Sequence, residues 1–354
     1  MTIQKGKEAT MKRSTTIAAI SAALLATTGL ARADGELNIF NWGNYTAPEM
    51  IKKFEETYKV KVTVTDYDSN DTAIGKIRQG GHGYDIVVPS ASYVPIWISE
   101  GLLLESNPNQ MENFKNVDPK WVDVPFDPGR KYTVPWQWGT TGVSVDTSVY
   151  SGDINTAAIF LDPPAELAGK INVVPEMADI MHLAIKYMGG EPCTGDLEVL
   201  KKVRDKLVEA KTKWISMNYG NIEAMAKGDY AATVNWNGAS MRMRLEKASI
   251  HYGYPKDGYP IWMDNAAILK DAKNVDNAKL FLNFIMDPEN AAMISGFAKY
   301  ANGIAGSEKF MPAEMTTAPE IVPPAELADK GQFMLTCAPE VQEIYTKIWT
   351  EIQK

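Results

Sequence analysis

The stretch that decides the fold runs from residue 36 to residue 89 and reads ELNIFNWGNYTAPEMIKKFEETYKVKVTVTDYDSNDTAIGKIRQGGHGYDIVVP. Strand-like segments occur at 37–42, 60–67 and 84–89, and the residues between them have helical spacing. Strands that alternate with helices in this way predict a parallel sheet covered on both faces. Such sheets bind ligands beyond the carboxyl ends of their strands, so Trp42 and Ser90 follow two strands where a ligand would bind.

The second half of the chain repeats this alternation of strands and helices. Strand-like segments at 171–174 and 232–236 flank helical ones, and extended runs at 132–146 and about 262–269 lie between the two halves. Two strand-and-helix units with extended crossings between them are typical of a two-lobed clamp. We therefore expect an α/β protein with two lobes and two crossing segments.

The N-terminal residues have the pattern of a secretory signal. Met11-Lys12-Arg13 precedes the small and apolar run 15–30, and Ala31-Arg32-Ala33 has the form of a cleavage site. We expect residues 1–33 to be a signal peptide cleaved near Ala33, with Met1 or Met11 as the start. The alternative is an uncleaved anchor, but the run is short and rich in Ala, Ser and Thr for a membrane span.

The charge of the chain argues against nucleic-acid binding. Removal of residues 1–33 takes away five of the 36 basic and one of the 44 acidic residues, so the formal charge falls from −8 to −12. Nucleic-acid binding needs a basic surface. We expect no nucleic-acid partner.

The sequence has no motif for an enzyme or a cofactor. His82, His182 and His251 form no metal-spaced cluster, and the chain contains no G-x-S-x-G elbow, P-loop or G-x-G-x-x-G fingerprint. The glycines at 80–83 precede a strand, which is the wrong order for a phosphate site. We expect a binding protein without a metal or cofactor.

Cys193 and Cys337 are the two cysteines of the chain. An even number of cysteines in an exported protein predicts a disulfide, and closing so long a loop stabilises by about 4 to 5 kcal/mol on the chain-entropy model. The alternative is a pair of buried free thiols.

Several aromatic residues stand beside small polar or acidic ones where strands end. Aromatic faces and carboxylates together bind an organic cation, because both attract an ammonium while apolar walls exclude water. The segments are Asn41-Trp42-Gly43-Asn44-Tyr45, Pro89-Ser90-Ala91-Ser92-Tyr93, Trp236-Asn237-Gly238 and Trp262-Met263-Asp264. By contrast, Trp97, Trp121, Trp214 and Trp349 stand in amphipathic or connector segments and are expected to be structural.

Three acids are candidates to meet such a cation. Glu176 and Asp179 are three residues apart in the predicted first turn of a helix, so their side chains share one face. Acids in a first helical turn also interact favourably with the helix dipole, and this is the alternative explanation for Glu176 and Asp179. Asp264 follows Trp262 and Met263 on an apolar strand and needs a cationic partner, either a ligand ammonium or an internal Arg or Lys.

These segments resemble the periplasmic spermidine/putrescine-binding proteins of bacterial ABC transporters. The similarity is carried by FNWGNYTAPE, YDIVVPSASYV, VPWQWGTTGVSV, VNWNGASM, IWMDNAAI and DNAKLFLNFIMDPENAA. The resemblance implies a type II periplasmic-binding-protein clamp. With that fold we expect a first lobe of residues 34–140 plus 264–308 and a second lobe of residues 141–263 plus 309–354.

The resemblance also implies roles for individual residues in the cleft. Aromatic side chains would sandwich an alkyl chain, acids would hold the terminal amines, and Ser90 would line the cleft. The residues that match are Trp42, Tyr45, Ser90, Glu176, Asp179, Trp236, Trp262, Asp264 and Tyr300.

The sequence departs from the family pattern at three positions, so the ligand stays open. Ala239 stands where putrescine-type members often have an acid, Ser92 replaces an aromatic residue of some spermidine members, and a late glutamine of the family has no clear counterpart near Leu335. Relatives also bind γ-aminobutyrate and other amino compounds. A zwitterion of that kind would need a guanidinium, from Arg242 or Arg244. The alternative, which we favour, is that both arginines face solvent on the helix.

We expect a monomer that captures a small aliphatic amine in the periplasm and delivers it to an ABC-transporter permease in the inner membrane. Two alternatives stay open. One is an enzyme on the same clamp, which would need a nucleophile beside a base in the cleft. The other is a receptor that serves a chemotaxis or regulatory partner instead of uptake.

Overall fold

The structure is a computed structural model that describes residues 1–2 and 35–354. The expected signal peptide, residues 1–33, lies outside the described residues except for its first two positions. Within 35–354 the strands form one mixed sheet in the order β2-β1-β3-β9-β4-β7-β5-β6, with β10 beside β9 and β8 beside β4. The strands are β1 (Gly35–Trp42), β2 (Val60–Tyr67), β3 (Ile86–Val87), β4 (Thr133–Asp146), β5 (Ile171–Val173), β6 (Trp214–Met217), β7 (Ala232–Trp236), β8 (Ile250–Gly253), β9 (Tyr259–Ile268) and β10 (Gly331–Phe333).

The helices follow the strands closely in sequence. They are α1 (Pro48–Tyr58), α2 (Asn70–Arg78), α3 (Val94–Ser99), α4 (Ala158–Leu161), α5 (Met177–Tyr187), α6 (Leu197–Lys211), α7 (Ile222–Lys227), α8 (Asn237–Glu246), α9 (Val275–Ile285), α10 (Pro288–Ala298) and α11 (Pro339–Ile352). Short 3-10 turns connect several of them. No helix among the described residues is long and apolar enough to cross a membrane.

The first strands pair as the sequence predicts. β1 is parallel to both β2 and β3, with Trp42 beside Tyr67 at the carboxyl ends. The helices α1 and α9 cover this part of the sheet, because the apolar stripe of each faces it. Phe54 of α1 and Phe281 of α9 meet edge to face with ring centroids 5.1 Å apart. The pattern of alternating strands and helices therefore gives the expected α/β unit.

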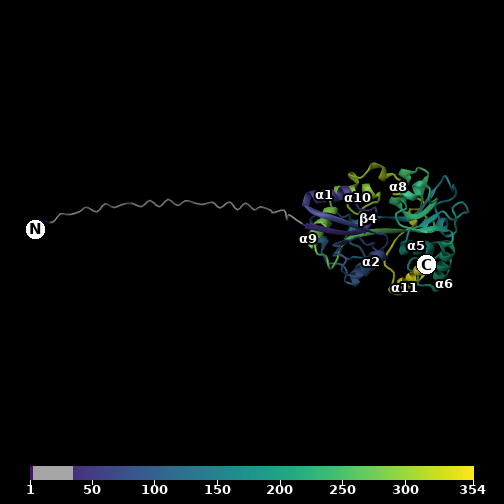
Figure 1. Ribbon diagram of the computed structural model, residues 1–354, viewed down its shortest axis with the longest axis horizontal. Coiled ribbons are helices and arrows are strands. Elements are labelled where there is room, and N and C mark those ends of the chain that lie inside the picture. The colour runs from purple at the N-terminus through teal and green to yellow at the C-terminus, as the bar shows by residue number, and fades with distance from the viewer. Residues whose placement is uncertain (3–34) are drawn as a thin grey trace. The chain divides into compact units, whose positions relative to one another are not determined.

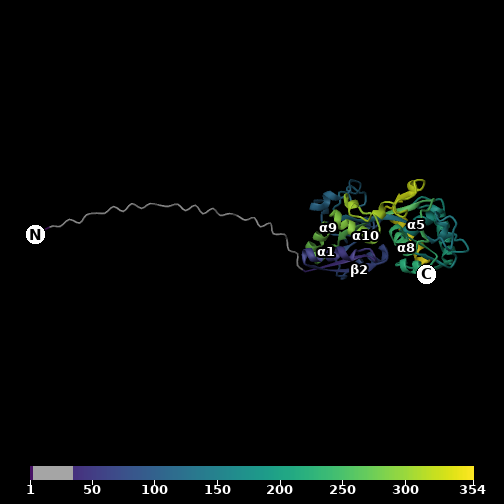
Figure 2. The same ribbon diagram turned by 90° about the horizontal axis from the view of Figure 1, so that it is seen from above.

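β4 and β9 are long antiparallel strands that belong to two hydrophobic cores. Val134 and Trp136 of β4 pack in the first core, whereas Val143 and Val145 pack in the second. Trp262 of β9 likewise belongs to the first core. Figure 1 shows β4 between the group of α1 and α9 and the group of α5, α6 and α11, and the turned view of Figure 2 also separates α1 and α9 from α5. Residues 35–354 thus form a two-lobed α/β fold.

The second lobe has its own parallel strands. β5 pairs in parallel with β6 and with β7, and β7 is antiparallel to β4. The helices α5, α6 and α11 bury their apolar faces in the core beside these strands, through residues such as Ile180, Val203 and Ile348. The lobe boundaries expected from the sequence, residues 34–140 plus 264–308 and 141–263 plus 309–354, stay a prediction.

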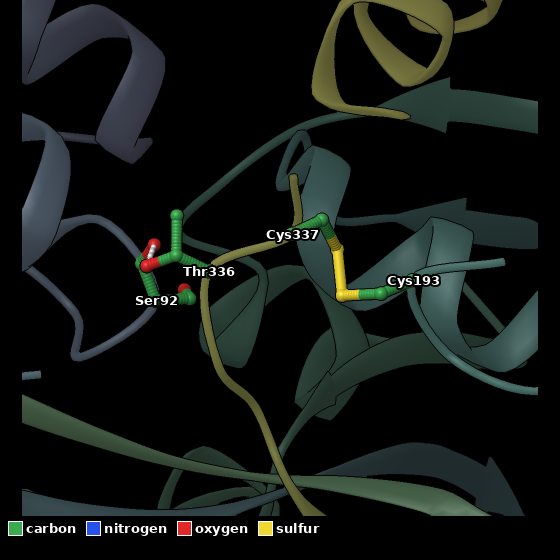
Figure 3. The surroundings of a disulfide bond; sticks show 4 residues. All are labelled: Ser92, Cys193, Thr336 and Cys337. Atoms are coloured by element: carbon green, nitrogen blue, oxygen red, sulfur yellow. Dashed lines mark hydrogen bonds between the residues drawn. A yellow bond between two sulfur atoms is a disulfide. The ribbon is translucent and has the colours of Figure 1, made fainter. Parts of the chain in front are cut away.

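A third segment, residues 331–337, also contacts both lobes. Thr336 donates a hydrogen bond of 2.5 Å from its Oγ1 to the backbone carbonyl of Ser92, which precedes α3 in the first lobe. The next residue, Cys337, forms a disulfide with Cys193, between α5 and α6 in the second lobe. Figure 3 shows this segment passing from the hydrogen bond to the disulfide. The structure thus contains a crosslink between the two cysteines, not two free thiols.

Candidate ligand-binding site

One cavity of about 30 Å³ brings together all nine residues that the sequence predicts for the cleft. They come from both lobes and from the crossing strand β9. The residues that line this cavity, called here the ligand cavity, are Trp42, Tyr45, Asn70, Ser90, Ser92, Glu176, Ala178, Asp179, Tyr219, Trp236, Trp262, Asp264, Tyr300 and Met334.

Asp264 lies on β9 and is 5% exposed. Its Oδ1 accepts a hydrogen bond of 2.6 Å from the hydroxyl of Ser90, at the end of the segment that follows β3. Burial raises the pKa of Asp264 to about 7, because an ionised carboxylate loses its hydration there, while the bond from Ser90 opposes the shift. The acid is thus held where a nearby cation would strongly favour its ionised form.

Asp179 belongs to the first turn of α5 and is 2% exposed. The indole Nε1 of Trp236 donates a hydrogen bond of 2.9 Å to its Oδ2, and its Oδ1 has no hydrogen-bond partner. Burial raises the pKa of Asp179 to about 6. One oxygen of this buried carboxylate is therefore available to a donor in the cavity.

Glu176 stands at the N-cap position of α5, one residue before the helix, and not within the first turn as the sequence pattern predicts. Its backbone is extended there, so the side chain leaves the second lobe and reaches α2. Its Oε2 accepts 3.1 Å from the backbone N–H of Asn70 and its Oε1 accepts 3.4 Å from Asn70 Nδ2. Burial, together with the neighbouring Asp179, raises the pKa of Glu176 well above its usual range.

Asn70 connects Glu176 to Asp264 through Ser90. Besides its bonds to Glu176, Asn70 donates 3.1 Å from Nδ2 to Ser90 Oγ and accepts 3.1 Å from the Ser90 backbone N–H. Ser90 Oγ then donates to Asp264. A continuous chain of hydrogen bonds therefore links acids from β9 and from the second lobe.

Aromatic rings form the walls between these acids. Trp42 meets Trp236 edge to face at 6.1 Å between ring centroids, and Trp262 meets Tyr300 in the same way at 5.1 Å. Tyr45 in turn lies edge to face against Tyr300 at 5.5 Å. The indole of Trp42 is fixed by a hydrogen bond of 3.0 Å from its Nε1 to the carbonyl of Val88. The faces of such rings attract a cation through their quadrupole, and the apolar walls shelter it from water.

No lysine or arginine lines the ligand cavity. Among the described residues, none of the salt bridges involves Glu176, Asp179 or Asp264. Arg244 pairs with the fully buried Glu320. Arg242 donates 3.2 Å to the carbonyl of Asn44 and lines a smaller neighbouring cavity. None of the three acids of the ligand cavity is therefore paired with a lysine or arginine among the described residues.

Four lining residues are not predicted by the sequence: Asn70, Ala178, Tyr219 and Met334. Ser92 also lines the cavity, at the position where some members of the family have an aromatic residue. Asn70 resembles an ordinary first residue of a helix, although it follows closely on the end of β2, beside the end of β1 at Trp42. Tyr219 precedes the short helix α7, in a segment whose sequence has neither the periodicity of a helix nor that of a strand. Met334 follows β10 on the third segment between the lobes, which the sequence gives no reason to place in the cleft.

The three histidines and the two cysteines of the chain lie outside the lining of the ligand cavity. The lining of the ligand cavity contains no histidine, cysteine or lysine, and the described residues include no group of three or more His, Cys, Asp or Glu side chains arranged to hold a metal ion. Trp97, Trp214 and Trp349 are buried in the cores. Trp121 likewise lies outside the ligand cavity.

Two α/β lobes around a cavity with acids and aromatic walls are the architecture of a solute-binding clamp. The family model for bacterial extracellular solute-binding proteins matches residues 49–323. The chain therefore belongs to this family, which is a family of binding proteins and not of enzymes.

Individual relatives match over almost the whole chain. A spermidine/putrescine-binding periplasmic protein of Haemophilus influenzae is 26% identical, over 91% of this chain and 90% of its own length. The putrescine-binding periplasmic protein of Escherichia coli is 28% identical, over 92% of this chain and 93% of its own. A solved structure from Listeria monocytogenes, assigned to spermidine/putrescine ABC transport, is 30% identical with a TM-score of 0.84, over 90% of this chain and 98% of its own.

Proposed function

We propose that the chain binds a small aliphatic polyamine, such as putrescine or spermidine, in the ligand cavity. The observation that carries this proposal is the convergence of Glu176, Asp179 and Asp264 on one buried aromatic cavity whose lining contains no lysine or arginine. Buried carboxylates without a cationic partner are costly, and a ligand ammonium removes that cost. Acids at both ends of a slot suit a dication.

Each part of a polyamine has a matching part of the cavity. One ammonium meets Asp264, and another meets Asp179 and Glu176. The methylenes between them lie against Trp42, Trp236 and the other aromatic rings, and each cation–π contact adds roughly 0.5 to 2 kcal/mol. A Kd in the micromolar range or below, about −8 kcal/mol, is expected.

The relatives support a role in uptake. Those named above are periplasmic polyamine-binding proteins or belong to spermidine/putrescine ABC transport. For this chain we infer that residues 1–33 direct export, that the mature protein works as a periplasmic monomer, and that it delivers its ligand to a permease in the inner membrane. Closure of the two lobes would create the surface that the permease recognises.

A zwitterion such as γ-aminobutyrate fits the cavity less well. Its carboxylate would need a guanidinium, but Arg244 is paired with Glu320 and Arg242 does not line the ligand cavity. A ligand with a single ammonium group would also leave some of the three acids without a cationic partner. An enzyme on this clamp would need a nucleophile beside a base, and no histidine or lysine among the described residues lines the ligand cavity beside Ser90.

Calorimetry and thermal shift test the proposal together. Putrescine, spermidine, γ-aminobutyrate and amino acids are each titrated into the purified protein. A ligand at one hundred times its Kd adds about 2.7 kcal/mol to the free energy of unfolding. We expect binding and stabilisation by at least one polyamine. Stabilisation by γ-aminobutyrate or an amino acid alone would overturn the proposal.

A further inference from the structure

A second cavity, of about 230 Å³, adjoins the ligand cavity. Ser92, Ala178 and Met334 line both, so the two spaces meet at these three side chains. All three are small or flexible: a hydroxymethyl group, a methyl group and an unbranched thioether. We call the second cavity the annex. The volume of the annex is much larger than that of the ligand cavity, so the annex has room for a bulkier group.

The annex has a different chemical character from the ligand cavity. Its lining contains no aspartate, glutamate, lysine or arginine. Apolar side chains such as Ile185, Phe333 and Leu335 and the disulfide between Cys193 and Cys337 form most of its walls. A charged group would lose its hydration there without gaining a partner, so the annex favours an uncharged group.

Three buried polar side chains in the annex lack hydrogen-bond partners, namely His182, Ser92 and the hydroxyl of Tyr345. His182 is 5% exposed and its Nε2 has none, and Ser92 is 8% exposed and its Oγ has none. Burial lowers the pKa of His182 to about 4, so its imidazole is neutral at pH 7. A neutral imidazole can accept a hydrogen bond from an N–H group, and a serine hydroxyl can donate one to a carbonyl. An amide group offers both.

The wall of the annex on the third segment is held in place at two points. Thr336 is bonded to the backbone of Ser92 in the first lobe, and Cys337 is crosslinked to Cys193 in the second. Figure 3 shows both attachments on the same stretch of chain. Since the segment is attached to both lobes, the annex is a built compartment between them and not a gap at the edge of one loop.

We propose that the annex binds an uncharged, amide-linked tail of a ligand whose ammonium groups occupy the ligand cavity, so that the protein accepts an N-acylated triamine as well as the free polyamine. This inference rests on the proposed function. The two remaining amines of such a ligand meet Asp264 and the Glu176 and Asp179 pair. Its acyl chain passes Ser92 into the annex, where the amide meets His182.

The test compares spermidine with its N1- and N8-hexanoyl derivatives by calorimetry on the purified protein. We expect at least one derivative to bind within tenfold of spermidine or more tightly. Leu335→Trp fills the annex from a residue that is 47% exposed, so folding is preserved. This variant should lower the affinity for the acyl derivative at least tenfold and change the affinity for spermidine less than twofold. His182→Phe removes the ring nitrogen at similar size and should weaken the derivative severalfold.

Leu245→Trp is the matched control, because Leu245 is 53% exposed and lines neither cavity. It should change neither affinity. If both derivatives bind more than tenfold more weakly than spermidine, or if Leu335→Trp weakens both kinds of ligand equally, the annex proposal is wrong while polyamine binding stands. If neither spermidine nor a derivative binds, both the annex proposal and the proposed function are wrong.

Discussion

The hydroxyl of Ser90 donates a hydrogen bond of 2.6 Å to Oδ1 of Asp264, although 174 residues separate the two in the sequence. Ser90 and Asp264 also pair as an antiparallel bridge, which joins the segment after β3 to the crossing strand β9. Asn70 extends this contact to Glu176 of the second lobe. The acid on the crossing strand and the acid at the start of α5 are therefore positioned by one shared network.

Asp264→Asn should weaken polyamine binding at least tenfold, because the amide keeps the shape but removes the charge that meets an ammonium. Calorimetry with spermidine measures the change. Asp229→Asn is the control, since Asp229 is exposed and outside the ligand cavity, and it should leave the affinity unchanged. Equal affinities for Asp264→Asn and the wild type, with both proteins folded, would refute the role given to Asp264.

Asn70→Ala should weaken binding about tenfold without unfolding the protein. The substitution keeps the backbone N–H that donates to Glu176 Oε2 but removes the Nδ2 group that donates to Glu176 Oε1 and to Ser90 Oγ. A hydrogen bond to a charged group contributes about 1.5 to 3 kcal/mol. Calorimetry gives the affinity and circular dichroism confirms the fold. Unchanged affinity would show that Glu176 does not depend on Asn70 for its position.

Polyamine affinity should fall as the pH is lowered below about 7. Burial raises the pKa of Asp264 to about 7 and that of Asp179 to about 6, whereas an ammonium requires the ionised forms. At pH values below these pKa values, polyamine binding therefore releases protons. For each proton released, the affinity falls about tenfold for each unit by which the pH is lowered. Calorimetry in buffers of different ionisation enthalpy counts the protons. An affinity independent of pH between 5 and 8 would contradict the buried acids as ammonium partners.

The same shifts predict that the free energy of unfolding of the protein without polyamine falls as the pH rises from about 4 to about 7. In this window the folded protein holds protons on Asp264 and Asp179 that the unfolded chain has lost, since their pKa values in the unfolded chain are near 3.9. Chemical denaturation at several pH values measures the slope. Asp264→Asn should flatten it, and an unchanged slope in this variant would contradict the assignment.

Ala239→Asp should raise the affinity for putrescine severalfold. Ala239 is buried, and its backbone N–H donates to the hydroxyl of Tyr300, a residue that lines the ligand cavity. An added carboxylate there would give a second diamine contact. Ala239→Asn has the same size without the charge and serves as the control. Equal putrescine affinities for the two variants would remove position 239 from ligand selection.

Replacing both cysteines by alanine should lower the free energy of unfolding by about 3 to 5 kcal/mol, because the disulfide closes a loop of 144 residues. Urea denaturation of the oxidised protein and the double variant gives the difference. A loss below about 1 kcal/mol would show that the third segment is held mainly by other contacts, such as that of Thr336 with Ser92.

Much of the fold could be predicted because its strands are local patterns. β2 spans the eight residues that the sequence indicates, and β4 and β9 coincide with the two predicted extended runs. The start of α5 was misplaced, because Glu176 suits a first helical turn by composition while its extended backbone sends the side chain to Asn70. That contact crosses between lobes, and no local pattern contains it.

The sequence predicts a lining residue of the cavity when that residue stands at or near the end of a strand. It does not predict a lining residue that reaches the cavity through tertiary packing alone. Trp42, Ser90 and Trp236 follow strand ends, so the rule for α/β sheets finds them. Met334 and Tyr219 enter from irregular segments, and their positions depend on how the lobes meet. The annex depends on the same contacts, which is why the sequence gives no sign of it.

A crystal structure of the protein with spermidine is the most direct test of the central claim that the three acids receive ammonium groups. The account predicts one ammonium nitrogen at roughly 2.7 to 2.9 Å from a carboxylate oxygen of Asp264 and another at a similar distance from Asp179 or Glu176. The methylenes should lie against Trp42 and Trp236. Spermidine bound outside the ligand cavity, or bound there without contact to these acids, would contradict it.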